Sequence, residues 1–207
     1  AAGIVTGRLA LRELDGEELI FAGHSVGEIT AAALAGVLSD EDAMRFVRVR
    51  ANGMAEAAAA SPTGMAAVLG GVEETVREAI DAAGLVAANS NGGGQIVAAG
   101  PIPAIEAFAA NPPARARVIP LKVAGAFHTE AMAPAVPALE EFAASLQVSD
   151  PTSALLTNRD GSAVASGEEF VKTLVSQVTS PVRWDLCMAT LLEREVAGII
   201  EVAPAGT

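Results

Sequence analysis

The sequence predicts an α/β protein into which a small α+β subdomain is inserted, and three features of the chain support this prediction. Short apolar runs alternate with helix-like segments before residue 62 and again after residue 124, a pattern typical of a parallel sheet covered by helices. Between residues 62 and 124, the order changes to strand, helix, strand, strand, helix, strand. Residues 23–27 match the G-x-S-x-G pattern of a sharp turn from a strand into a helix.

Composition limits the classes of protein that the chain can belong to. Of its 207 residues, 51% are hydrophobic, and 25 acidic against 13 basic side chains give a formal net charge of −12. The apolar content excludes a disordered chain, and the negative charge argues against a general binder of nucleic acids or anionic membranes. Two histidines and one cysteine argue against a structural zinc site. No apolar run reaches the roughly 20 residues of a membrane span, so we expect a cytoplasmic protein. The small number of histidine and cysteine residues leads us to expect no metal.

Before residue 62, apolar runs and their flanking residues predict one strand and three helices. The strand is an unbroken apolar run, which is typical of a parallel strand covered on both faces. The last helix begins at a Ser-Asp pair, a common helix N-terminus, and ends before a Ser-Pro pair. The expected elements are the end of a helix at Leu9–Leu14, a strand at Leu19–Ala22, a helix at Glu28–Val37, and a helix from Ser39 to before Ser61.

The inserted segment has four strands and two helices in the ferredoxin-like split order. The expected strands are Met65–Leu69, Leu85–Ala88, Gln95–Ala99 and Val118–Val123, and the expected helices are Glu73–Ala83 and Pro101–Ala110. After it, the α/β pattern resumes with a helix at Glu130–Leu146, a strand at Ala154–Thr157, helices at Glu168–Val178 and Asp185–Glu195, and a last strand at Gly198–Val202. We therefore expect a large α/β subdomain made of residues 1–61 and 125–207, and a small ferredoxin-like subdomain made of residues 62–124.

The most informative motif is Gly23-His24-Ser25-Val26-Gly27, which lies between the buried strand and the next helix. A serine on such a sharp turn needs small residues two positions away on each side, because a Cβ atom there would clash. The turn also directs backbone N–H groups of the new helix toward Ser25, and the N–H of Val26 is the natural donor to an oxyanion. Ser25 is therefore a candidate nucleophile, and the alternative is a serine that only caps the helix.

A serine becomes a good nucleophile when a base takes its proton, and the chain offers His24 and His128. His24 adjoins Ser25, where side chains on a sharp turn diverge, so we expect it to pack beneath the turn. His128 follows the last strand of the insert at a loop edge, where catalytic groups of α/β folds gather, and this favours it as the base. The alternative is a surface or helix-capping histidine. Asp150 and Asp160 are candidates by residue type for a third, acidic member, but no motif supports either.

Arg50 is a cation on an otherwise apolar helix face. Its i, i+4, i+7 and i+11 spacing places it with Ala43, Val47 and Met54. A cation buried without a partner is costly, so an anion should meet it. Two interpretations remain open. The side chain could reach solvent or an internal partner, or its planar fork could bind a substrate carboxylate through two hydrogen bonds.

Four motifs, in the order in which they occur, resemble the malonyl-CoA:acyl-carrier-protein transacylases and the acyltransferase domains of polyketide and fatty-acid synthases. They are Gly23–Glu28, which reads G-H-S-V-G-E, Arg50, Gly125–His128, which reads G-A-F-H, and Gln177–Trp184, which reads Q-V-T-S-P-V-R-W. The resemblance covers essentially the whole chain, the insert included. It implies a hydrolase-like parallel-sheet subdomain, malonyl-CoA as a coenzyme A thioester substrate, no separate cofactor, and an acyl carrier protein as the acceptor.

The resemblance also implies roles for individual residues. Ser25 would be acylated, and His128 would act as general base and later as acid. The backbone carbonyl of Gln177 would orient His128, which explains why no acid was evident. Arg50 would hold the malonyl carboxylate. Phe127, which the methylmalonyl form of the motif replaces by serine, would line the acyl pocket together with Met54.

The chain departs from the family pattern at both ends. The family carries an N-terminal strand that ends in a G-Q-G-x-Q motif, which does not occur here, and the end at Ala203–Thr207 is shorter than the family's closing segment. We therefore expect the N-terminal strand and the C-terminal tail to be missing. Two rival functions stay open: a serine esterase or thioesterase, for which Arg50 would have no use, and a non-catalytic carrier-protein-binding fragment.

The partner implied by the resemblance adds a further expectation. Carrier proteins are usually acidic, and so is this chain, so docking requires a local basic patch. The candidate cations are Arg115, Arg117, Lys122, Arg159, Lys172 and Arg183.

Overall fold

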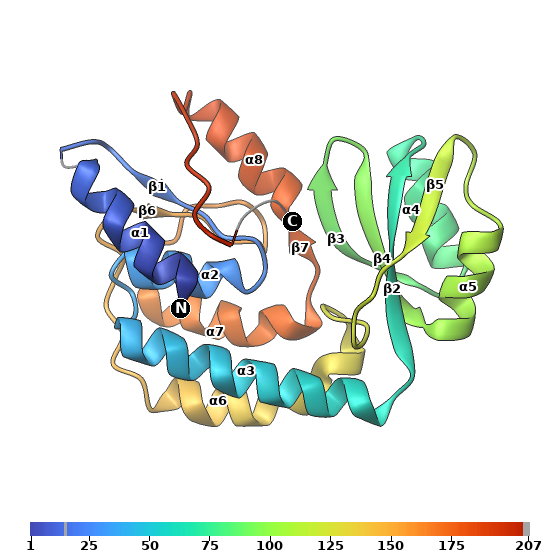
Figure 1. Ribbon diagram of the computed structural model, residues 1–207, viewed down its shortest axis with the longest axis horizontal. Helices are drawn as coiled ribbons and strands as arrows, with labels where there is room; N and C mark the ends of the chain where they lie inside the picture. The colour runs from blue at the N-terminus through green and yellow to red at the C-terminus, as the bar shows by residue number, and fades with distance from the viewer. Residues whose placement is uncertain (15, 205–207) are drawn as a thin grey trace.

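The computed structural model describes residues 1–14 and 16–204, so the last three residues of the expected short tail lie outside the described part. A helical part and a strand-rich part lie beside each other along the longest axis (Figure 1). Helix α3 (Asp40–Ala60) runs along the helical part and leads directly into β2 (Thr63–Gly70) of the strand-rich part. The division of the chain into subdomains of residues 1–61 with 125–207 and of residues 62–124 stays a prediction.

The helical part contains a short parallel sheet. Strand β1 (Ile20–Phe21) pairs in parallel with β6 (Ala154–Leu155). Helices cover this pair, as expected for parallel strands, and the predicted α/β fold class is confirmed. The helices are α1 (Ala2–Glu13), α2 (Gly27–Leu34), α3, α6 (Val136–Ala144), α7 (Gly167–Ser176) and α8 (Trp184–Glu193). None of the helices in residues 1–14 and 16–204 is both long enough and apolar enough to cross a membrane.

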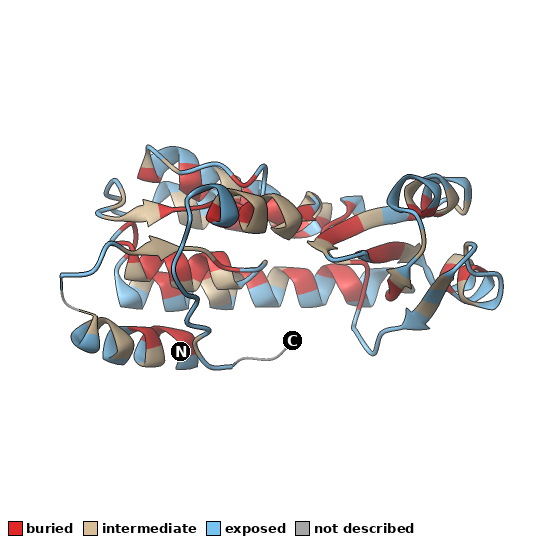
Figure 2. Cartoon of the chain, turned by 90° about the horizontal axis from the view of Figure 1, so that it is seen from above, coloured by how far each residue is buried: buried red, intermediate tan, exposed pale blue. Residues whose placement is uncertain are grey.

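Large apolar side chains from these elements share one core. Phe46, Leu139, Leu155 and Leu174 are each at most 1% exposed. Figure 2 shows that buried and exposed residues alternate along α3, as one apolar helix face requires. Burial of this face stabilises the arrangement of the helices, because apolar surface is removed from water on folding.

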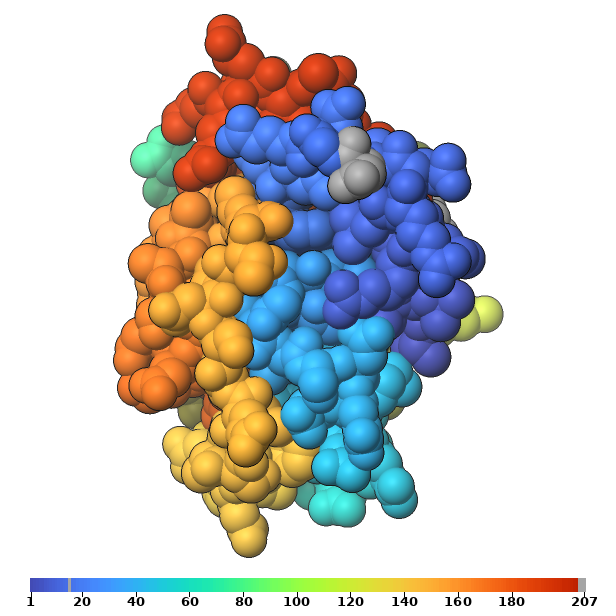
Figure 3. All heavy atoms as spheres, turned by 90° about the vertical axis from the view of Figure 1, so that its left-hand side faces the viewer, coloured from blue at the N-terminus to red at the C-terminus, as the bar shows by residue number. Residues whose placement is uncertain are grey.

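Backbone hydrogen bonds join segments that are distant in sequence. The N–H of Thr152 donates to the carbonyl of Ala35 at 2.8 Å, and that of Ser149 donates to Val37 at 3.2 Å. Figure 3 shows the same relationship at the end of the molecule away from the strand-rich part, where blue N-terminal residues lie beside yellow and orange ones. The loop before β6 is thereby fastened to the end of α2.

The predicted last strand at Gly198–Val202 is wrong. This segment forms no strand and pairs with no strand among the described residues, and Ile199 and Ile200 are 67% and 62% exposed. A strand forms when its backbone groups pair with those of a neighbour, so an apolar run without a neighbour does not become one.

The predicted helix Glu130–Leu146 is divided. It begins as the 3-10 helix η1 (Glu130–Ala135) and becomes α6 only at Val136. Pro134 and Pro137 lie in this stretch, and a proline has no N–H to donate to the helical ladder. The predicted helix Glu168–Val178 likewise ends in the 3-10 helix η2 (Gln177–Thr179).

The strand-rich part follows the predicted order of elements. They are β2, α4 (Glu73–Ala82), β3 (Val86–Gly92), β4 (Gln95–Pro101), α5 (Ile102–Ala110) and β5 (Ala116–Pro120). Strand β2 pairs antiparallel with β4 and β5, and β3 pairs antiparallel with β4. A separate core that includes Val68, Ile80 and Phe108 lies between this sheet and its two helices.

One strand of this sheet comes from outside the insert. Strand β7 (Val182–Arg183) pairs in parallel with β3, which gives the sheet order β5-β2-β4-β3-β7. This pairing could not be predicted, because a two-residue strand has no hydrophobic pattern of its own. It attaches the sheet to the segment between α7 and α8.

Candidate active site

The G-x-S-x-G residues form a tight turn between β1 and α2. Ser25 has a φ of 53°, which lies in the left-handed region that non-glycine residues rarely adopt. A Cβ atom at Gly23 would lie 2.1 Å from the carbonyl carbon and oxygen of Gly27, so this glycine is sterically required, as predicted. A Cβ atom at Gly27 would meet nothing within 4 Å, so the same expectation is wrong there. The steric restriction therefore applies to Gly23 alone, and Gly27 is the first residue of α2.

Ser25 and His128 meet across the helical part. The Oγ atom of Ser25 lies 2.7 Å from Nε2 of His128, whose other ring nitrogen, Nδ1, lies 2.9 Å from the backbone carbonyl of Gln177. A carbonyl can only accept, so Nδ1 carries the proton and Nε2 of the neutral ring accepts from the serine hydroxyl. Burial of the ring, aided by the charge of Arg50, lowers the pKa of His128 to about 4. His128 is therefore a neutral acceptor at physiological pH.

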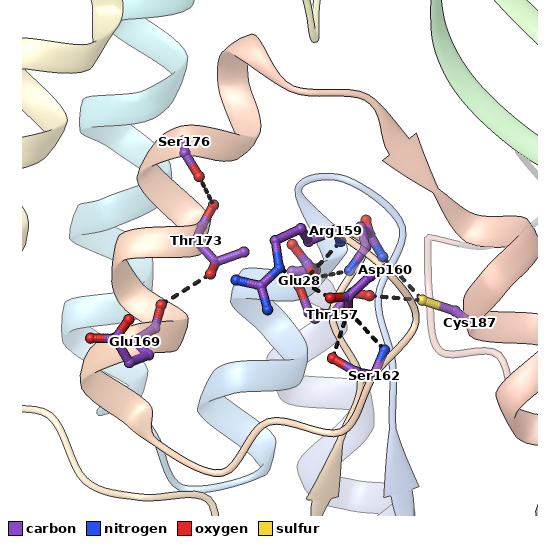
Figure 4. Close-up of polar contacts among 10 residues, drawn as sticks. Glu28, Thr157, Arg159, Asp160, Ser162, Glu169, Thr173, Ser176 and Cys187 are labelled. Carbon is purple, nitrogen blue, oxygen red and sulfur yellow. Dashed lines mark hydrogen bonds and ion pairs between the residues drawn. The ribbon is translucent and has the colours of Figure 1, made fainter.

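Neither aspartate named by residue type supports His128. Asp150 accepts a hydrogen bond from the backbone N–H of Gly167, and Asp160 accepts hydrogen bonds from Ser162. Figure 4 shows Asp160 beside Ser162 and Arg159. The Gln177 carbonyl occupies the place where an acid would orient the ring.

Arg50 lies over the same serine. Its side chain is buried, with 8% of the residue exposed, and Nη2 donates to Oγ of Ser25 at 3.2 Å and to Oε1 of Gln177 at 3.3 Å. Burial lowers the pKa of Arg50 to about 10, so it remains a cation at neutral pH. Its Nε atom is buried and has no hydrogen-bond partner among the described residues. The side chain therefore keeps an unused donor next to the hydroxyl.

The other residues expected at the site are next to members of this group in the chain or share a helix face with them. Met54 is on the same helix face as Arg50, 4% exposed, and Phe127 packs against the same core while staying partly exposed. The side chain of Val26 is exposed, and its backbone N–H makes no hydrogen bond with any residue that the structure describes. That N–H follows directly after Ser25 in the turn.

The position expected for His24 is wrong. Its side chain is exposed at the surface of the turn, and its Nε2 lies 2.9 Å from Oδ1 of Asn91 on β3. The ring also meets Trp184 edge to face at 5.8 Å between centroids. Side chains of adjacent residues on the turn do diverge, but His24 turns toward the strand-rich part, where Asn91 and Trp184 contact its ring.

The sequence reasoning missed Asn158. Its Oδ1 accepts from the backbone N–H of Ser25 at 2.7 Å, and its Nδ2 donates to the carbonyl of Gly23 at 2.8 Å. This one side chain therefore holds the turn backbone on both sides of His24, directly before the nucleophile candidate Ser25. A usable signal was its place just after the predicted strand Ala154–Thr157, where functional groups of α/β folds gather.

Glu28, quoted only as the end of a motif, is completely buried. It accepts hydrogen bonds from the backbone N–H of Asn158 and from Nε2 of Gln177. Burial raises the pKa of Glu28 from 4.5 to about 7, against the lowering effect of these hydrogen bonds and of Arg50. Figure 4 shows Glu28 close to Thr157. The sequence signal was an acidic residue whose helix is otherwise almost wholly apolar.

The chain is similar in sequence to known proteins over nearly its whole length. Residues 15–206 match the acyl transferase domain family. A malonyl CoA-acyl carrier protein transacylase of Mycobacterium tuberculosis (strain ATCC 25618 / H37Rv) is 54% identical over 194 residues, which are 94% of this chain and 64% of that relative. One from Bacillus subtilis (strain 168) is 35% identical over 190 residues, 88% of this chain and 60% of that relative. The chain thus spans less than two thirds of the length of these relatives.

Solved structures show the same relationship. The crystal structure of MCAT from Mycobacterium tuberculosis matches with a TM-score of 0.96 at 51% identity, covering 100% of this chain and 69% of that one. A type II PKS acyl-carrier protein in complex with its malonyl-transacylase, PlMCAT:AntF, matches with a TM-score of 0.85 at 28% identity, covering 94% and 65%.

The fold and the turn first define a class: an α/β protein that carries a serine on a strand–turn–helix elbow. Within this class, the chain belongs to the acyl transferase domain family. The resemblance drawn from four motifs is therefore confirmed.

Proposed function

We propose that this protein transfers a malonyl group from malonyl-CoA to the phosphopantetheine thiol of an acyl carrier protein, through a malonyl ester on Ser25, for fatty-acid or polyketide synthesis. One observation carries the proposal: Oγ of Ser25 lies 2.7 Å from the base His128 and 3.2 Å from the cation Arg50. A nucleophile, a base and a carboxylate-binding group thus meet at one atom. The similarity to malonyl CoA-acyl carrier protein transacylases supports the same function.

The reaction has two balanced halves. In the first, Nε2 of His128 takes the proton of Ser25 while Oγ attacks the thioester carbonyl, and the N–H of Val26 donates to the developing oxyanion. The ester forms as the carbon–sulfur bond breaks, and His128 gives its proton to the departing thiolate of coenzyme A. In the second, His128 takes the proton of the phosphopantetheine thiol, the sulfur attacks the ester, and Ser25 regains the proton. Serine, histidine and backbone supply all of this chemistry, so no separate cofactor is needed.

Arg50 accounts for the choice of a malonyl group. Its buried Nε has no partner among the described residues, and a carboxylate could accept from Nε and from a terminal nitrogen together. Such a pair would also fix the acyl chain above Ser25. Phe127 and Met54 then form the wall of the acyl pocket, and Phe127 would exclude a methyl branch.

The acidic carrier protein is proposed to dock beside β5. Three of the six candidate cations already pair with neighbouring carboxylates: Arg159 with Asp160, Lys172 with Glu169, and Arg183 with Asp185. The other three, Arg115, Arg117 and Lys122, form no ion pair with any residue that the structure describes. They lie on or next to β5, the edge strand of the sheet, and are exposed. We place the reaction in the cytoplasm, which suits a lone cysteine that is buried and reduced.

Intact-protein mass spectrometry after exposure to malonyl-CoA tests the function. We expect the protein to gain one malonyl group, Ser25→Ala to gain none, and phosphopantetheinylated carrier protein to remove the group. Malonate release without a carrier would instead identify a thioesterase. Failure to acylate freshly folded protein, with carrier binding retained, would identify a non-catalytic binding fragment.

A further inference from the structure

Two separate supports hold the reacting pair in place. Asn158 bonds to the backbone of the turn on both sides of His24, at the carbonyl of Gly23 and at the N–H of Ser25. The backbone carbonyl of Gln177 receives Nδ1–H of His128. Asn158 follows β6, whereas Gln177 begins η2, so the two supports come from separate segments of the chain.

The carboxylate of Glu28 contacts both supports at once. Oε1 accepts from the backbone N–H of Asn158 at 2.5 Å, and Oε2 accepts from Nε2 of Gln177. The same Nε2 donates to the carbonyl of Ser25 at 3.1 Å, and Oε1 of Gln177 accepts from Arg50 at 3.3 Å. Glu28 itself is only three residues after Ser25, on the first turn of α2. The nucleophile, the base and the cation are therefore joined through one buried carboxylate.

We propose that Glu28 is a positioning residue, which couples the support of the Ser25 turn to the support of the His128 base. The inference rests on the proposed roles of Ser25 and His128 and assigns Glu28 no contact with substrate. The ionised carboxylate, which is the main form above pH 7, suits this place because both neighbours donate N–H groups and its two oxygens only accept. An amide offers one acceptor and would direct an NH₂ group at a second donor.

A positioning role differs from a purely structural one in its effect on the chemical step. Loss of a structural residue lowers the population of folded protein, whereas loss of coupling slows the reaction of Ser25 in protein that is fully folded. Small displacements of reacting groups lower rates steeply. The reactivity of Ser25 toward diisopropyl fluorophosphate measures this directly, because the reagent needs an activated serine and has no carboxylate for Arg50.

Labelling rates of four variants and the unmodified protein test the proposal. Glu28→Gln should react roughly 10- to 100-fold more slowly than the unmodified protein while it remains folded by circular dichroism. Ile80→Val, in the core of the strand-rich part, is the matched control for mild loss of stability and should react at the unmodified rate. Gln177→Leu removes the amide that receives the coupling but keeps the backbone carbonyl, and it should be slowed as well. The double variant Glu28→Gln/Gln177→Leu should be no slower than the slower single variant, because both changes remove the same contact between the Glu28 carboxylate and the Gln177 amide.

The outcomes separate this inference from the proposed function. No labelling of the unmodified protein would contradict the Ser25–His128 pair itself. Normal labelling of the unmodified protein together with an unchanged rate for folded Glu28→Gln would overturn the positioning role. If Glu28→Gln does not fold, the rate of Glu28→Asp decides, because this change keeps the charge but withdraws the carboxylate from its two donors: a lower rate supports the coupling, and an unchanged rate refutes it. Malonyl-CoA kinetics should agree, with kcat lowered by Glu28→Gln and KM little changed.

Discussion

Nε2 of His128 lies 2.7 Å from Oγ of Ser25, although the two residues are 103 positions apart in the chain. Both have a positive φ, 53° for Ser25 and 62° for His128. Such backbone conformations cost free energy in non-glycine residues and persist where surrounding contacts hold them. Here Asn158 holds the backbone of the serine turn and the Gln177 carbonyl holds the histidine ring. The pair is therefore a product of the tertiary fold.

Replacement of Arg50 by alanine should separate recognition of the carboxylate from catalysis. Each hydrogen bond to a charged group contributes about 1.5–3 kcal/mol, so malonyl transfer should fall roughly 10- to 100-fold or more. Acetyl transfer should fall much less, because an acetyl group has no second carboxylate. Acylation rates with malonyl-CoA and acetyl-CoA measure the difference. Arg45→Ala, on the exposed face of the same helix, is the control, and equal losses with both substrates would contradict the role of Arg50.

Charge reversal beside β5 should weaken the second half-reaction alone. In Arg115→Glu/Lys122→Glu, transfer from acylated protein to carrier protein should slow, and the loss should shrink at high salt as charges are screened. Acylation of Ser25 by malonyl-CoA should be unchanged. Lys172→Glu, whose native side chain pairs with Glu169, serves as the control. A double variant that transfers normally at low salt would place the docking surface elsewhere.

Glu28 and His128 should give the free energy of unfolding opposite pH dependences. Burial raises the pKa of Glu28 from 4.5 to about 7, so within that window the folded protein keeps a proton that the unfolded chain has lost, and stability falls as pH rises. Burial lowers the pKa of His128 from 6.5 to about 4, so stability falls as pH drops through that window. Each effect amounts to about 3 kcal/mol, and the two nearly cancel. Arg50 and Cys187 do not titrate here, since their pKa values are about 10 and 11.

Single substitutions should expose each dependence. His128→Gln should become less stable as pH rises from 4.5 toward 7, because only Glu28 remains. Glu28→Gln should become more stable as pH rises from 4 toward 6.5, because only His128 remains. Urea unfolding midpoints across this range measure both slopes, and the unmodified protein measured under the same conditions is the reference for both variants. Slopes identical to that of the unmodified protein would contradict the burial-driven shifts.

The two glycines of the serine turn should respond differently to alanine. Gly23→Ala places a Cβ atom 2.1 Å from the Gly27 backbone, so the turn must shift and stability should fall by about 1–3 kcal/mol, with loss of Ser25 reactivity. Gly27→Ala meets open space at the start of a helix and should keep or slightly raise stability. Thermal unfolding distinguishes them. Equal destabilisation by both changes would mean that the turn is not limited by steric contact at Gly23.

Much of the site could be predicted because its signals are local. The turn around Ser25 is a contiguous motif, and Arg50 is conspicuous on its helix face because its apolar neighbours recur at helical spacing. The element order of the insert followed from alternating strand and helix patterns. In each case, the residues that carry the signal lie within a few turns or one strand of each other.

The missed features depend on contacts between distant segments. Asn158 meets Ser25 across 133 positions, and Gln177 meets Glu28 across 149. No periodicity links such residues, so their partnership could not be read from the chain. The wrong prediction of a strand at Gly198–Val202 has the same origin. An apolar run favours a strand, but the strand forms only where a neighbouring strand pairs with it.

Strand β7 joins the two parts of the molecule, in addition to the chain crossings that enter and leave the insert and the contact of His24 with Asn91. Val182 is paired to Asn89 in the strand-rich sheet, and the same short segment begins at Gln177, whose carbonyl receives the His128 ring. Any movement of the sheet that keeps this pairing carries Val182 with it, and Val182 lies five residues after Gln177, whose carbonyl accepts from the imidazole. The orientation of the His128 ring is therefore linked to the position of the strand-rich sheet.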